Sequence, residues 1–385
     1  MLDLDKLHSD LGLVNRPVSQ ARGLPNELYT SGDALALERD RIFKRGWACL
    51  GFGCDVPEPG DAMPVDFLGM PLLLVRDHDG QLRVYENVCR HRGMILVSEK
   101  KNFGGVIRCP YHSWCYSLDG RLRATPHVGG PGINRHEAVV PDRAGLNEIR
   151  AGVFMDLVFV DIDGDAPGFN QWTAPLRSRF EDFSDRPIYH GGQGSGFSLD
   201  IGANWKLILE NNCESYHLPW VHPGLNSYSK LEDHYHIEAP GFFSGQGTRV
   251  YRPDLQSDLS FPDFPDLPGK WDSGAEYASL YPNSFVSVHR DHVWFALLSP
   301  KAHDRTVERV EIYYSSEEAA ISERFKPLRE KNAALWKDVL TEDVMVTEGM
   351  QKGRSAPIFD GGVFSPVMDS PTHCFHAWVA ERLGS

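Results

Sequence analysis

Short apolar runs separated by Gly, Pro and Asp occupy the chain from Trp47 to about Val160. Apolar runs bounded by turn residues in this way are typical of β-strands. Asp79-Gly80 and Asp119-Gly120 have the composition of hairpin turns. The pattern therefore predicts a small all-β unit, whose clearest strands are Pro71–Arg76, Gln81–Glu86, Val106–Cys109 and Cys115–Ser117.

After residue 160 the pattern changes, because the expected strands and helices fall into separate blocks. A helix is expected from Trp205 to about Tyr216, and irregular chain rich in Pro and Asp over Pro253–Pro268. Later strands are expected at Asn283–His289, Val293–Ser299 and Glu308–Ser315, and helices at Glu317–Arg329 and Asn332–Met350. A β module followed by such blocks favours the α+β class over a parallel α/β sheet.

The chain has 385 residues, which is enough for two domains. We expect a lead-in over residues 1–44 that belongs to the catalytic domain and carries a short helix at Asp33–Phe43. The β unit is then assigned to residues 45–160 and the catalytic domain to residues 161–385. A net charge of −14 argues against a nucleic-acid partner.

The cysteines and the apolar runs indicate the compartment. Seven cysteines is an odd number, and their spread is not that of a secreted disulfide framework. The first residues are charged and resemble no secretory signal, and the chain contains no apolar run of membrane-spanning length. We therefore expect a cytoplasmic protein that uses some of its thiols to bind metal.

Two loops of the β unit each supply one thiol and one imidazole: Cys89 with His91, and Cys109 with His112. A structural zinc site of the Cys2His2 type is one interpretation, but zinc fingers pair cysteine with cysteine and histidine with histidine. Mixed loops suit a two-iron cluster in which one iron has two sulfur ligands and the other two nitrogen ligands. Cys89–Gly93 and Cys109–Trp114 resemble the motif of the Rieske ferredoxin domain, with Ser113 where many members have Gly.

A second group of candidate ligands lies between Asn204 and Pro223. Glu210, Glu214 and His217 are spaced to share one face of a continuous helix. His222 follows five residues after His217, and we expect Pro219 to break the helix so that both imidazoles meet.

A third ligand must come from elsewhere in the chain. Asp343 lies on the apolar stripe of the last long helix, where a carboxylate is costly unless it is paired or bound to metal. An ion pair with a distant Lys or Arg is the plain alternative. Two histidines and one carboxylate form the facial triad of Fe(II) oxygenases.

The segment Asn204–Pro223 resembles the iron-binding segment of Rieske non-haem iron oxygenase α subunits. Residues 342–353 and 375–378 resemble the C-terminal helix and closing strand of that family. The resemblance implies an antiparallel helix-grip catalytic domain with His217, His222 and Asp343 as iron ligands. It also implies that Glu214 bridges the cluster and the iron. A Glu at this position is similar to members acting on quaternary amines and to other monooxygenase or demethylase members.

The implied activity is that of a terminal oxygenase with a Rieske [2Fe-2S] cluster and a mononuclear Fe(II). Its expected partners are O2, a small organic substrate and a separate ferredoxin or flavin reductase fed by NAD(P)H, because the chain contains no dinucleotide-binding fingerprint. The family implies a head-to-tail homotrimer. We expect monooxygenation leading to N- or O-dealkylation. The alternatives are a quaternary-ammonium monooxygenase, a cis-dihydrodiol-forming dioxygenase, and a zinc-containing or electron-carrying protein without catalysis.

The substrate pocket is expected above the iron. Asn211 on the iron-binding helix is a candidate catalytic residue. Aromatic walls would hold either a quaternary ammonium by cation–π attraction or an arene. Core packing is the plain alternative for each candidate wall residue, and these are Tyr281, Phe285, Ser287, His289, Trp294 and Phe295.

Overall fold

The computed structural model describes residues 2–384, which form two compact units. One unit is residues 44–169, and the other combines residues 2–43 with residues 170–384. The helix α4 (Phe169–Trp172) lies at the boundary. In the described residues, no helix combines the length and the apolar character needed to span a bilayer.

The unit of residues 44–169 is built from antiparallel strands. A seven-stranded sheet has the order β1-β10-β9-β4-β3-β2-β5, and β6-β7-β8 form a separate three-stranded sheet. Both predicted hairpin turns are present, since Asp79-Gly80 joins β3 to β4 and Asp119-Gly120 joins β7 to β8. The strands are β1 (Ala48–Phe52), β2 (Asp61–Phe67), β3 (Met70–Arg76), β4 (Leu82–Glu86), β5 (Lys101–Asn102), β6 (Val106–Arg108), β7 (Cys115–Ser117), β8 (Leu122–Ala124), β9 (Glu148–Phe154) and β10 (Leu157–Asp161).

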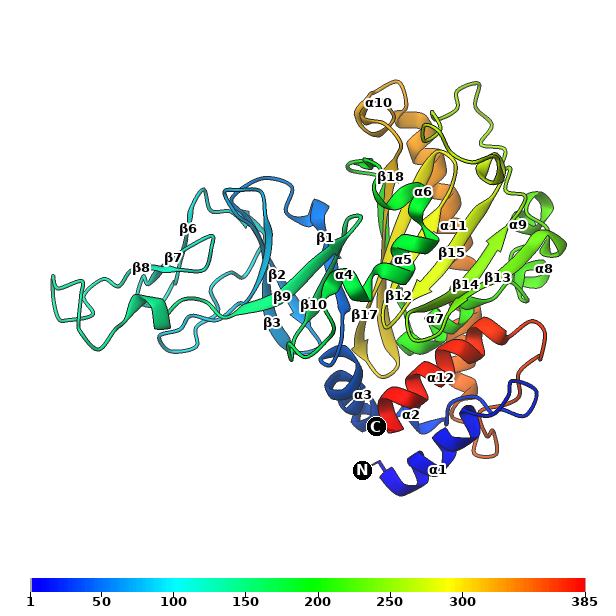
Figure 1. Ribbon diagram of the computed structural model, residues 1–385, viewed down its shortest axis with the longest axis horizontal. Coiled ribbons are helices and arrows are strands. Elements are labelled where there is room, and N and C mark those ends of the chain that lie inside the picture. The colour runs from blue at the N-terminus through cyan, green and yellow to red at the C-terminus, as the bar shows by residue number, and fades with distance from the viewer. Residues whose placement is uncertain (1, 385) are drawn as a thin grey trace. The chain divides into compact units, whose positions relative to one another are not determined.

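The other unit is an antiparallel sheet with helices on both faces (Figure 1). The strand order is β11-β18-β17-β16-β15-β14-β13, and β12 also pairs with β18. Its strands are β11 (Tyr189–His190), β12 (Gly196–Ile201), β13 (His234–Ala239), β14 (Phe243–Thr248), β15 (Ala275–Leu280), β16 (Ser284–Val288), β17 (His292–Ala302) and β18 (Arg305–Tyr314). Its helices are α1 (Leu4–Val14), α2 (Glu27–Thr30), α3 (Gly32–Glu38), α5 (Ala174–Arg179), α6 (Glu181–Ser184), α7 (Trp205–Cys213), α8 (Leu218–Val221), α9 (Pro223–Tyr228), α10 (Glu317–Ile321), α11 (Lys326–Gly353) and α12 (Ser370–Gly384).

The two faces of this sheet are covered by different helices. α7 packs against β14 and β15 on one face, and α11 and α12 pack against α7. The opposite face is covered by α5 and α6, where Arg179 pairs with Glu276 and Phe180 contacts Phe243. α7 is therefore a central helix, and all of its residues except Asn212 are buried.

Three details of the expected secondary structure are corrected. The last helical region breaks at residues 322–325 and not near residue 331, because Pro327 suits the first turn of α11. Residues 375–378 lie in the helix α12 and not in a strand. The lead-in also contains α1, which is capped by the Asp3 side chain and was not expected.

A buried ion pair anchors the start of α7 to the N-terminal segment. Lys206 Nζ lies 2.6 Å from Glu38 Oε1, and both side chains are fully buried. Lys206 Nζ also donates to the Leu28 carbonyl at 2.8 Å, and Trp205 Nε1 donates to Glu38 Oε2 at 2.8 Å. The segment before residue 44 therefore completes the core of the catalytic unit.

We expect Glu38→Ala to lower the free energy of unfolding by about 3–5 kcal/mol, because it leaves the buried Lys206 ammonium unpaired. Urea unfolding measures the loss. The double variant Glu38→Leu with Lys206→Met is the control, since replacing both charges with apolar groups is often neutral or stabilising. A stability within about 0.5 kcal/mol of the native value in Glu38→Ala alone would contradict this role.

Candidate functional sites

The four predicted cluster ligands lie on two similar loops. Gly93 N donates to the Cys89 carbonyl, and Ser113 N donates to the Cys109 carbonyl, both at 3.0 Å. Gly93 and Ser113 have φ angles of 73° and 58°. The turn therefore requires the left-handed region at both positions, which explains the Gly common in the family where this chain has Ser113.

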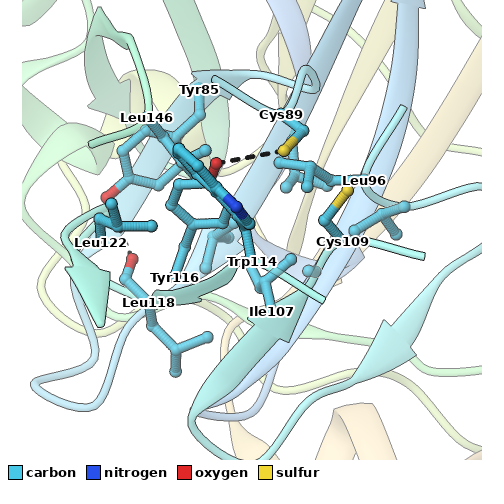
Figure 2. Packing of buried hydrophobic residues seen from close by; sticks show 14 residues of the cluster. Tyr85, Cys89, Leu96, Ile107, Cys109, Trp114, Tyr116, Leu118, Leu122 and Leu146 are labelled. Carbon is cyan, nitrogen blue, oxygen red and sulfur yellow. Dashed lines mark hydrogen bonds between the residues drawn. The ribbon is translucent and has the colours of Figure 1, made fainter. Parts of the chain in front are cut away.

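The thiols and the imidazoles of these loops meet at the edge of a buried cluster. Cys89 and Cys109 are each 2% exposed, and Figure 2 shows their side chains side by side, with the Tyr116 hydroxyl bonded to the Cys89 sulfur. The rings of His91 and His112 lie 4.7 Å apart, centroid to centroid.

These residues fit a Rieske cluster. His112 Nδ1 is buried without a hydrogen-bond partner, so this nitrogen is free to bind a metal. Burial raises the pKa of the Cys109 thiol, so a bare thiolate is disfavoured there and a bound cation would compensate it.

The second site is organised where α7 ends. Asn204 caps the start of α7 by accepting from Lys206 N. The helix ends at Cys213, and Glu214 is extended with φ −129° and ψ 160°. The expected continuous face of Glu210, Glu214 and His217 is therefore wrong. The break falls before Pro219, which lies in the first turn of the next helix, α8.

The side chains of His217, His222 and Asp343 converge on one point. Asp343 Oδ1 lies 2.9 Å from His222 Nε2 and 3.7 Å from His217 Nε2. One ligand atom from each of the three residues lies within 4.8 Å of the others. The residues that flank α8, His217 before it and His222 after it, supply the imidazoles and α11 supplies the carboxylate, so this group could hold a metal ion.

Two further carboxylates orient the imidazoles. His217 Nδ1 lies 2.7 Å from Glu214 Oε1, and His222 Nδ1 lies 2.7 Å from Glu342 Oε2. With both Nδ1 atoms held, both Nε2 lone pairs point toward Asp343, which is the arrangement typical of metal-binding histidines. Glu342 was not predicted as a site residue, although its position beside Asp343 was a signal.

The electrostatics of this group favour a cation. Burial lowers the pKa of His222, but the carboxylates of Asp343 and Glu342 outweigh burial and raise the pKa above its ordinary value. A group that attracts a proton in this way is equally suited to a metal ion.

A cavity of about 60 Å³ opens beside the three converging side chains. One residue from each of seven strands lines it, because alternate residues of a strand share a face. These residues are Ile201, His234, Gln246, Tyr277, Phe285, Trp294 and Glu308. Asn211 and Asn212 of α7, and Trp336, Val339 and Leu340 of α11, line the other side.

The structure brings only part of the predicted pocket to this cavity. Asn211, Phe285 and Trp294 line it. The ring of Phe295 points to the other face of β17, where it contacts Tyr313. Tyr281 bonds to Ser244, and Ser287 bonds to His289, which lines a separate cavity.

Tyr277, Trp336 and Glu308 line the cavity but were not predicted. Burial raises the pKa of Glu308 to about 8, and the charge of Asp343 adds to the rise. The available signal was the alternation of Thr306, Glu308 and Val310, which places one acidic residue on an otherwise uncharged buried face.

Two protein families match the chain. Residues 192–385 match the family "Ring hydroxylating alpha subunit (catalytic domain)", and residues 46–138 match the "Rieske [2Fe-2S] domain". The chain therefore belongs to the ring-hydroxylating α-subunit family of Rieske non-haem iron oxygenases. Its cofactors are a Rieske [2Fe-2S] cluster and a mononuclear iron, and it is an oxidoreductase that incorporates O2.

Curated relatives align along most of the chain. The carnitine monooxygenase oxygenase subunit of Escherichia coli K12 is 26% identical over 341 residues, which are 87% of this chain and 84% of the relative. The chloroplastic choline monooxygenase of Amaranthus tricolor is 25% identical over 367 residues, which are 93% of this chain and 77% of the relative.

Solved structures share the fold. The quaternary ammonium Rieske monooxygenase CntA with L-carnitine has a TM-score of 0.76 at 22% identity, with 97% of this chain and 98% of the other covered. Naphthalene 1,2-dioxygenase from Rhodococcus sp. has a TM-score of 0.71 at 19% identity, with 99% and 98% covered. The expected α+β fold, with an N-terminal Rieske domain, is confirmed.

We expect Glu342→Ala to weaken binding of the mononuclear iron by about 10- to 100-fold, because it removes the group that orients His222. Anaerobic iron titration against a chelator measures the affinity. Glu330→Ala, an exposed position on the same helix α11, is the matched control. Equal iron affinity in Glu342→Ala and the native protein would show that Glu342 does not support the site.

Proposed function

We propose that this protein is a monooxygenase that hydroxylates a C–H bond next to the nitrogen of a small N-alkylated cation. The observation that carries this proposal is the aromatic lining of the cavity beside the candidate iron ligands, from Tyr277, Phe285, Trp294 and Trp336. Aromatic faces attract ammonium groups. The carnitine and choline monooxygenases among the relatives act on substrates of this chemistry.

The size of the cavity supports a compact substrate. An engineered apolar cavity of about 150 Å³ holds benzene. The cavity here measures about 60 Å³, which is less than half of that volume. A fused arene would require the walls to move, and a small alkylammonium group requires less movement.

We assign His217, His222 and Asp343 as the iron ligands, and Cys89, His91, Cys109 and His112 as the cluster ligands. When bound, these cofactors supply electron transfer and activation of O2. Asn211, which is 8% exposed, presents its amide to the cavity and is assigned to position the substrate. In the reaction one oxygen atom of O2 is inserted into the C–H bond, and the other leaves as water with two electrons from a reductase and two protons from solvent. The new hydroxyl group next to nitrogen then loses its proton, so that the carbon leaves as an aldehyde and the C–N bond electrons stay with the amine.

We further propose a head-to-tail homotrimer in which Glu214 connects His217 to the cluster ligand His112 of the neighbouring subunit. Trp220, on α8 next to this site, is 71% exposed. On the Rieske unit, Tyr111 beside His112 is 54% exposed. Exposed aromatic residues next to both sites are suited to an interface between subunits. A solved structure of a quaternary ammonium Rieske monooxygenase gives insights into inter-subunit electron transfer in that protein.

A separate ferredoxin or flavin reductase, fed by NAD(P)H, is proposed as the electron source. We also propose that the protein works in the cytoplasm. None of the seven cysteines forms a disulfide, and two of the proposed cluster ligands, Cys89 and Cys109, bind iron only as reduced thiols.

We expect the metal-loaded protein, supplied with NADH and a reductase, to convert choline to an amine and an aldehyde, and the aldehyde, trapped as it forms, to carry one atom of ¹⁸O from labelled O2. Mass spectrometry of the product measures the label. Naphthalene serves as the comparison substrate. Two results together would contradict the proposal and indicate ring dihydroxylation. Naphthalene would give a cis-dihydrodiol with two labelled oxygen atoms, and choline, carnitine and glycine betaine would not react.

We expect Glu214→Gln to retain both metal sites and to lose nearly all turnover, because its amide is a weaker partner for the His217 Nδ1–H group. Iron and sulfide analysis, and the rate of cluster oxidation after addition of O2 and substrate, measure the two effects. Normal turnover at full metal content would contradict the bridging role.

Mixed oligomers test whether the electron crosses between subunits. His217→Ala subunits lack the iron ligand, and Cys109→Ser subunits lack a cluster ligand, so neither is active alone. Refolded or co-expressed mixtures should regain activity if the cluster of one subunit serves the iron of the next. Inactive mixtures with normal assembly would contradict the trimer proposal.

A further inference from the structure

The cavity contains a buried carboxyl group that has no role in the metal site. Glu308 is 2% exposed, and its Oε1 atom is buried without a hydrogen-bond partner. The side chain lines the cavity together with Tyr277 and Trp294. A buried polar atom without a partner is costly, so its retention requires an explanation.

The surroundings of Glu308 are apolar within the sheet. Its cross-strand neighbours are Leu199 on β12 and Leu298 on β17. Along β18, the residues on the same face are Thr306, whose hydroxyl donates to the Ala203 carbonyl, and Val310. Among the described residues, none donates a hydrogen bond to Glu308 Oε1, and the side chain lines the cavity.

The metal ligands do not account for Glu308 either. The group of ligand atoms within 4.8 Å of one another contains His217, His222 and Asp343, and Glu308 is not part of it. The nearby charge of Asp343 has the same sign and opposes ionisation of Glu308. Among the described residues that line the cavity, none is Lys or Arg. The described cavity lining therefore offers Glu308 no lysine or arginine partner, and a cationic group of a ligand in the cavity would fill that role.

We propose that Glu308 is the anionic subsite that binds the charged nitrogen of the substrate, with Tyr277, Trp294 and Trp336 forming the aromatic walls around it. The inference deepens the proposed function and rests on it. It also narrows the substrate class to cations that have no carboxylate near the nitrogen. The cavity lining contains no Lys or Arg to pair with a substrate carboxylate, and it contains two carboxyl groups, Glu308 and Asp343, that would repel one.

The test compares a cation with a neutral molecule of the same shape. Choline and 3,3-dimethylbutan-1-ol differ at one atom, since carbon replaces the charged nitrogen. Calorimetric titration of the anaerobic holoenzyme gives a Kd for each. We expect Glu308→Gln to weaken choline binding by about 30-fold or more, the usual effect of removing one partner of a buried charge pair. Binding of the neutral analogue should change by less than about threefold.

Glu311→Gln is the matched control. Glu311 is also a buried glutamate of β18, but it faces the other side of the sheet and pairs with His190 and Arg309. Its choline affinity should equal that of the native protein. In the native protein, choline should also bind more tightly than glycine betaine, which carries a carboxylate near its nitrogen.

The outcomes separate the inference from the function on which it rests. Equal losses for choline and the neutral analogue in Glu308→Gln, or a loss of mononuclear iron from this variant, would overturn the role of Glu308 alone. Native protein that binds choline through Glu308 but does not oxidise it would overturn the proposed reaction and retain the subsite. Native protein that binds neither choline nor tetramethylammonium would overturn both.

Discussion

The candidate iron site depends on the burial of one short helix. α7 lies between the sheet and the helices α11 and α12, and its first turn is tied to the N-terminal segment through Lys206 and Glu38. Since α7 ends at Cys213, Glu214 is extended, and its carboxylate contacts the Nδ1 atom of His217, three residues further along the chain. The position of both imidazoles therefore follows from a helix that cannot shift without exposing its core.

The opposite side of the site is set by the register of the antiparallel sheet. Each of seven strands contributes one side chain to the cavity, so its wall combines residues from distant parts of the sequence. The candidate iron ligands His217 and His222 are held by hydrogen bonds to carboxylates, whereas the sheet wall includes the aromatic residues Tyr277, Phe285 and Trp294. The sheet wall can therefore vary without changing the candidate iron ligands, because none of these ligands lies on a strand.

The features that could be predicted from the sequence are those that depend on the spacing of residues close together in the chain. Two motifs were recognised because their ligating residues lie within a few positions of one another: the mixed thiol and imidazole loops, and the pair of histidines around a helix break. The family matches confirm the class of protein and its cofactors. Asp343 was found because a carboxylate on an apolar helical stripe is conspicuous. The pocket was harder to predict, because Trp294 and Phe295 are adjacent and only one of them can face the cavity. Tyr277 and Glu308 were not predicted, because the sequence alone does not show which face of each strand lies against the cavity. That depends on how the strands pair.

The order of the segments along the chain has a consequence for biosynthesis. The Rieske unit is continuous, from residue 44 to residue 169, whereas the catalytic unit needs both of its separate segments. Leu24 N donates to His376 Nδ1 at 3.1 Å, and α1 packs against α12. The Rieske unit can thus form while the ribosome is still translating. The N-terminal segment before residue 44 must wait for α12, so the apolar side chains that α1 buries, Leu7, Leu11 and Val14, stay exposed to chaperones and proteases until α12 has been made.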